Sequence, residues 1–82
     1  MNPDDLIQRI QQAIPDALVQ PSGEGCSFNL HVVSASFAGE SLLKRHRRVM
    51  AALQDLIASG ALHAVTLQTD TPEETSAKLG KR

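Results

Sequence analysis

Apolar residues recur along the chain with two different periods, and the alternation of these periods predicts the order of its elements. The first segment has helical spacing: Leu6, Ile7, Ile10 and Ile14 form one stripe. We therefore expect a helix from Pro3 to about Ile14, capped by Asn2 and ended by Pro15. The short apolar run Ala17–Gln20, bounded by prolines, predicts an edge strand.

A period of two follows. Phe28, Leu30 and Val32 alternate with more polar neighbours, which predicts a strand over residues 28–33. The glycines and proline of Pro21–Gly25 favour a reversal between the two strands. The two strands are therefore expected to form a hairpin.

Helical spacing returns after residue 40. Ser41 is the expected cap of one continuous helix that reaches about Ala58, with Gly60 as its stop. At about 100° per residue, eight residues are predicted to share its buried face. They are Leu42, Leu43, His46, Val49, Met50, Leu53, Leu56 and Ile57.

The last part of the chain predicts a strand over Leu62–Thr69 and a short helix opened by a capping box at Thr71–Glu74. Only Ala77 and Leu79 could anchor this helix, so residues 76–82 are expected to fray. The order is helix, strand, strand, helix or helix pair, strand, helix. It favours a single α+β domain over residues 1–82, with helices on one face of a three-stranded mixed sheet.

Composition excludes several classes of protein. The net charge of −1 attracts neither phosphates nor anionic lipid to the molecule as a whole. A single cysteine suits a reducing compartment, and neither a leader nor an apolar run of roughly 20 residues is present, so we expect a soluble cytoplasmic protein. We find no paired nucleophile and base, no phosphate loop and no carboxylate pair. An enzyme is therefore not expected.

Strand topology brings two candidate ligands together. A helical connection between the second and third strands makes them parallel, so both begin at the same end of the sheet. Cys26 and His63 precede these strands. A thiolate and an imidazole about one strand spacing (~4.8 Å) apart suit zinc, copper or iron–sulfur iron better than calcium or magnesium. Such a centre takes about four ligands, so the other two must come from elsewhere.

Each candidate also has an ordinary interpretation. Cys26 could be a small loop thiol without a role, and His63 a plain strand residue. His46, on the apolar face of the long helix, is expected to be a satisfied structural histidine, and His31 a surface residue. The basic cluster, consisting of Lys44, Arg45, Arg47 and Arg48, could be a solvated face, a docking surface for an acidic partner or a phosphate-contacting patch. Within it, Lys44 and Arg48 should project to water, while Arg45 and Arg47 flank the apolar stripe.

The stretch from Ser34 to Glu74 carries a compound motif: Phe-x-Gly-x-Ser-Leu, Arg-His-Arg, His-Ala and Thr-Pro-Glu-Glu. It resembles the signature of the BolA family. The resemblance implies a KH-like (type II) fold in which the long helical region is broken as a helix-turn-helix. Trp usually follows the Thr-Pro-Glu-Glu of this family, and Thr75 takes its place here, which puts the docking of the last helix in question.

The same resemblance implies a function. BolA-like proteins partner monothiol glutaredoxins in a heterodimer that shares a [2Fe–2S] cluster, to which the glutaredoxin brings its own cysteine and a bound glutathione. The BolA-like chain supplies the histidine of the His-Ala motif, here His63, and a Cys or His of the hairpin loop, for which Cys26 is the candidate by position. No cluster is expected in the isolated monomer. This role is that of a non-enzymatic adaptor in iron–sulfur assembly, trafficking or iron and redox stress regulation.

Two alternatives remain open from the sequence. A DNA-binding transcriptional regulator using residues 44–48 fits a KH-like fold, although the chain lacks a Gly-x-x-Gly loop and an aromatic platform. A homodimer could also supply two copies of Cys26 and of His63 to one metal centre.

Overall fold

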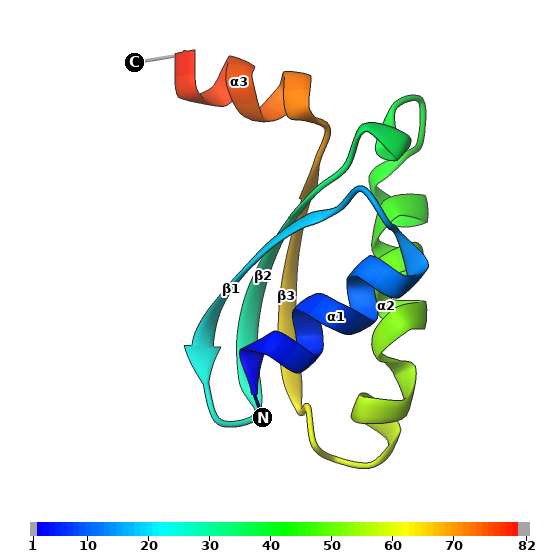
Figure 1. Cartoon of the computed structure of the whole chain (residues 1–82), viewed down its shortest axis with the longest axis vertical. Helices are drawn as coiled ribbons and strands as arrows, with labels where there is room; N and C mark the ends of the chain where they lie inside the picture. Colours follow the sequence, from blue (N-terminus) through cyan, green and yellow to red (C-terminus); the bar gives the residue numbers. More distant parts are fainter. Residues whose placement is uncertain (1, 81–82) are drawn as a thin grey trace.

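A computed structural model describes residues 2–80 of the chain, and side chains through residue 78. Its order of elements is the expected α+β order (Figure 1). The elements are α1 (Pro3–Ala13), β1 (Leu18–Glu24), β2 (Ser27–Val33), the 3₁₀ helix η1 (Ala35–Phe37), α2 (Leu42–Ala58), β3 (Ala64–Asp70) and α3 (Pro72–Gly80). Residues 81 and 82, on which part of the expected fraying falls, lie outside the described range.

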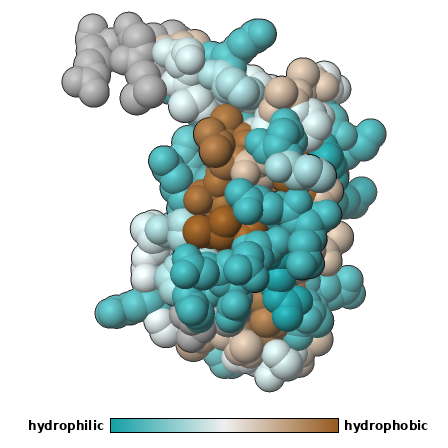
Figure 2. All heavy atoms as spheres, in the orientation of Figure 1, coloured by the Kyte–Doolittle hydropathy of each residue, from teal (hydrophilic) through white to brown (hydrophobic). Residues whose placement is uncertain are grey.

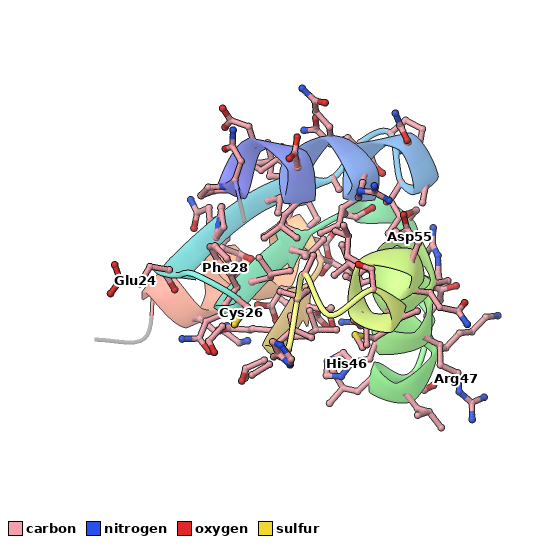
Figure 3. The ribbon with its side chains drawn as sticks, turned by 90° about the horizontal axis from the view of Figure 1, so that it is seen from below. Glu24, Cys26, Phe28, His46, Arg47 and Asp55 are labelled. Atoms are coloured by element: carbon pink, nitrogen blue, oxygen red, sulfur yellow. The ribbon has the colours of Figure 1, made fainter. Side chains whose placement is uncertain are left out.

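The sheet has the order β1-β2-β3, with β1 antiparallel and β3 parallel to β2. This mixed topology confirms the prediction. The helices α1 and α2 pack together on one face of the sheet (Figures 1 and 3). Because side chains alternate along a strand, Phe28, Leu30 and Val32 of β2 all face these helices and are buried.

One hydrophobic core fills the space between the helices and the sheet. Nearly all of its side chains are aliphatic, and Phe37 of η1 is among those fully buried. Its members are Leu6, Ile10, Ile14, Ala17, Phe28, Leu30, Val32, Phe37, Val49, Leu53, Leu56 and Leu62. Figure 2 shows that the face carrying α1 is otherwise largely hydrophilic, with an apolar patch where α1 meets the strands. Among residues 2–80, no helix has the length and apolar character needed to cross a membrane.

The long helix α2 is continuous, as expected, with Ser41 as its cap and Gly60 just beyond its end. The break that the resemblance implies is not found within Leu42–Ala58, and the only helical segment before α2 in the described residues after β2 is η1. The predicted buried face is wrong in part, because Leu42, Leu43 and Ile57 are 62%, 61% and 36% exposed. The buried face of α2 instead includes Arg45 and, in part, Ala52, because α2 packs against α1 as well as the sheet.

The hairpin is tighter than expected. The strand β1 does not end at Gln20 but continues through Pro21 to Glu24, and only Gly25 and Cys26 form the turn. Pro21 is tolerated because β1 is an edge strand. Gly25 has a φ of 67° at the first central position, as in the type II′ turns that suit two-residue hairpins.

The start of β3 also differs from expectation. The strand begins at Ala64, and Leu62 is instead a buried residue of the preceding loop.

The capping box is confirmed, since the Glu74 N–H donates to the Thr71 hydroxyl (3.1 Å) and the Thr71 N–H to the Glu74 carboxylate (2.8 Å). The helix it opens extends to Gly80.

Candidate functional site

Cys26 and His63 meet at one end of the sheet, as the topology predicted. The His63 N–H donates to the Cys26 carbonyl at 2.8 Å, and the Ala64 N–H approaches the same oxygen at 3.2 Å. The parallel ladder continues from this contact, with Ser27 opposite Ala64. The tight turn before β2 and the loop before β3 therefore hold the two candidate ligands on adjacent backbones.

Both side chains are accessible from outside the molecule. Cys26 is half-buried in the turn and His63 is exposed. Glu24, the nearest polar substitute for the thiol, projects away from Cys26 in Figure 3. Of these two residues, Cys26 is the one whose backbone contacts His63.

The chemistry of the two side chains is that of ligands for a soft or borderline metal. A sulfur and an imidazole nitrogen are ligand types found on iron–sulfur clusters and zinc. A cluster takes about four such ligands, which is two more than this pair supplies. Within residues 2–80, no group of three or more histidine, cysteine, aspartate or glutamate side chains is placed to hold a metal ion. Cys26 and His63 alone would supply two of the four ligands that such a centre takes.

Arg45 of the predicted basic cluster is a structural residue. Its side chain is 7% exposed, and its guanidinium binds both carboxylate oxygens of Glu74 at 2.7 and 3.3 Å. Its Nε also donates to the Glu40 carbonyl at 3.0 Å. Hydrogen bonds from Arg45 and the Thr71 N–H lower the pKa of Glu74, and the bond to Glu74 raises the pKa of Arg45. The expectation that Arg45 only flanks the apolar stripe is corrected.

Arg48 is also held within the fold, against the expectation that it projects to water. It donates to the Glu40 carboxylate at 2.7 Å and lies over the Phe37 ring, 5.3 Å from its centroid. Lys44 is exposed and 3.8 Å from the same carboxylate. Arg47 is exposed and has neither a hydrogen bond nor an ion pair within residues 2–80. The cluster is therefore mostly committed to internal contacts.

The other two histidines differ from their predicted roles. His31 is half-buried and its Nε2 lies 2.8 Å from the carboxylate of Asp70, which is 4% exposed. This contact could not be predicted from the periodicity of one strand, because His31 lies on β2 and Asp70 on β3. His46 is half-buried, yet no hydrogen bond joins its ring to the part of the chain that the structure describes, so a satisfied structural role is not supported.

Asp70 also binds the Lys78 ammonium at 2.6 Å and the Gln68 amide at 3.1 Å. Burial would raise the pKa of Asp70, but the hydrogen bonds from Lys78, His31 and Gln68 outweigh burial and lower that pKa. These contacts join α3 to the sheet, at the opposite end of β3 from His63.

Comparison with known proteins identifies the family of the chain. The profile of the family described as BolA-like protein matches residues 9–74. An uncharacterised protein of the rpoN-murA intergenic region of Acinetobacter guillouiae is 40% identical, over 90% of this chain and 89% of its own length. A SufE-like protein 1 of Arabidopsis thaliana is 51% identical over 57% of this chain, which spans 12% of that relative.

A solved structure extends the match to three dimensions. A BolA protein homologue from Coxiella burnetii superposes with a TM-score of 0.81 at 32% identity, covering 93% of this chain and 97% of the homologue. Sequence profile, full-length relative and fold agree, and the chain belongs to the BolA-like family.

Proposed function

We propose that this protein is a non-enzymatic adaptor that binds a monothiol glutaredoxin and shares a [2Fe–2S] cluster with it. The observation that supports this most directly is the backbone contact between Cys26 and His63, which lie on adjacent segments at one end of the sheet. Membership of the BolA-like family supports it independently. The cellular role would be cytoplasmic, in iron–sulfur assembly, trafficking or the response to iron and redox stress.

In this proposal each residue has a defined part. His63 contributes a neutral ring nitrogen and Cys26 a thiolate, while the glutaredoxin contributes its cysteine and the thiol of bound glutathione. A histidine ligand in place of a thiolate raises the reduction potential of a [2Fe–2S] centre. The chain thus alters the properties of a cluster that the glutaredoxin would otherwise hold with thiolates.

DNA binding by residues 44–48 has less support. Arg45 is bound to Glu74 and Arg48 to Glu40, so neither guanidinium is free for a phosphate without breaking an internal ion pair. Only Lys44 and Arg47 of the cluster are exposed. Two cations on a chain of net charge −1 give a weak electrostatic footprint for a duplex.

Spectroscopy of the mixed complex tests the proposal. A monothiol glutaredoxin, glutathione and the wild-type chain should form a cluster whose visible absorption and circular dichroism differ from those of the glutaredoxin alone. His63→Ala should remove this difference because it removes the nitrogen ligand. His31→Gln is the matched control, since His31 binds Asp70 and lies away from Cys26.

The two variants separate ligation from folding. A normal mixed spectrum with His31→Gln and a glutaredoxin-like spectrum with His63→Ala support the proposal. An unchanged mixed spectrum with His63→Ala would exclude His63 as a ligand. A wild-type chain that leaves the glutaredoxin spectrum unaltered would refute the shared cluster itself.

A further inference from the structure

We infer that the partner sharing the cluster docks on one flank of this molecule, formed by the exposed shoulder of α2 and the outer edge of β3. This inference rests on the proposed function. The flank consists of Leu43, His46, Met50 and Ile57 from α2, which are exposed or half-buried, and of the backbone edge of β3 at Val65 and Leu67, whose side chains are half-buried against the core. The partner face that fits it is apolar at its centre and acidic at its rim.

The α2 part of the flank is apolar and exposed. Leu43 is 61% and Ile57 36% exposed, and Arg47, Met50, Ala51, Gln54 and Ile57 line a shallow, mainly apolar groove. The opposite side of α2 packs against α1, where Asp55 binds Arg9. An apolar groove facing away from the rest of the fold is a typical feature of a protein interface.

The β3 part of the flank is a sheet edge without the residues that commonly hinder the addition of another strand. β3 is an outer strand, and residues 64–69 contain neither a charge nor a proline. The other outer strand, β1, carries Pro21 and Glu24, which are common protections against strand addition. The difference between the two edges indicates that the partner covers the β3 edge rather than the β1 edge.

The backbone of β3 also turns hydrogen-bonding groups toward this edge. Ala64 donates toward β2 through its N–H, and Asp70 accepts from Ser34 through its carbonyl. Alternate residues of a parallel ladder face the same way, so Val65, Leu67 and Thr69 turn their backbone groups outward. The Thr69 carbonyl is consistent with this, since Arg45 of α2 approaches it at 3.4 Å.

The flank is continuous with the proposed cluster site. His63 immediately precedes β3, and α2 ends at Ala58, only five residues earlier in the chain. In Figure 3, Cys26 and His46 both lie on the side of the molecule opposite α1. A partner that reaches Cys26 and His63 to complete the cluster would therefore cover the adjoining flank.

Charge defines the rim of the partner face. Arg47 borders the groove, is exposed, and has no ion pair within residues 2–80. None of the flank residues is acidic, so a carboxylate on the partner would meet Arg47 without competition.

Binding of a monothiol glutaredoxin, measured by calorimetry with glutathione and cluster present, tests this surface. Ile57→Asp and Leu43→Asp should each weaken binding about tenfold or more, because each places a charge within an apolar interface. Leu43 is exposed, so Leu43→Asp should fold normally. Arg47→Glu should also weaken binding, and its effect should be largest at low ionic strength, where charges are screened least.

Leu18→Asp is the matched control, since Leu18 is 67% exposed on β1 at the far edge of the sheet. It should bind like the wild type. Equal affinities for Ile57→Asp, Leu43→Asp and the wild type, together with a normal wild-type mixed-cluster spectrum, would overturn the docking surface and leave the proposed function standing. Weakening by Leu18→Asp alone would also overturn it, and a wild type without a mixed-cluster spectrum would overturn both.

Discussion

At the scale of single residues, the site depends on how two glycines set the turn that carries Cys26. Gly25 supplies the positive φ of the turn, and Gly23 has a φ of 113° at the end of β1. A Cβ on Gly23 would lie 2.5 Å from the Ser27 carbonyl oxygen, whereas a Cβ on Gly25 would meet no atom within 4 Å. The position of Cys26 is therefore more sensitive to Gly23, although Gly25 is its neighbour.

This difference predicts the effect of two alanine substitutions. Gly23→Ala should lower the free energy of unfolding by roughly 1–3 kcal/mol, because it combines backbone strain with a contact to main-chain atoms. Gly25→Ala should cost less, since only the backbone strain applies. Urea unfolding of both variants measures this, and equal losses would show that the close approach to Ser27 does not matter.

At the scale of elements, α3 is attached mainly by polar contacts. Glu74 binds Arg45, which lies 29 residues away in sequence, and Lys78 binds Asp70. The pKa of both carboxyls is lowered, so each is ionised in the folded state at a pH where an ordinary carboxyl begins to protonate. Thr75, in place of the expected tryptophan, gives α3 little apolar anchorage.

Acid should therefore loosen the contact between α3 and the sheet. Because the pKa of Asp70 is below its ordinary value of 3.8, the unfolded chain binds more protons than the folded chain between the two values. The stability from Asp70 is complete above the ordinary value and is lost as pH falls through the lower, folded value. As pH decreases across this range, the midpoint temperature of thermal unfolding should fall less steeply for Asp70→Asn than for the wild type. Parallel curves would contradict the role of Asp70.

The sequence predicted the elements better than their contacts. The periods of two and 3.6 identify β2, α1 and α2, and the helical crossover alone places Cys26 and His63 at one end of the sheet. The burial of Arg45 could not be read from these periods, because its partner Glu74 comes from another element. The exposure of Leu43 has a similar cause, since the packing of α1 decides which arc of α2 is buried.

At the scale of the whole molecule, the fold divides into a stabilising end and an exposed end. Arg45, Glu74, Asp70 and Lys78 form their ion pairs where β3 meets α3, whereas Cys26 and His63 lie at the start of the parallel strands. Most of the motif shared with the BolA family therefore builds the fold. The proposed chemistry depends on His63 and on one residue outside that motif.

Pulsed electron paramagnetic resonance of the reduced mixed complex tests that proposal most directly, because it detects a nitrogen bound to the cluster. With the chain labelled with ¹⁵N-histidine and an unlabelled glutaredoxin, we expect coupling to a ¹⁵N nucleus. The coupling should disappear with His63→Ala and persist with His31→Gln. A reduced cluster without ¹⁵N coupling, or one whose coupling survives His63→Ala, would contradict the assignment of His63 as the ligand.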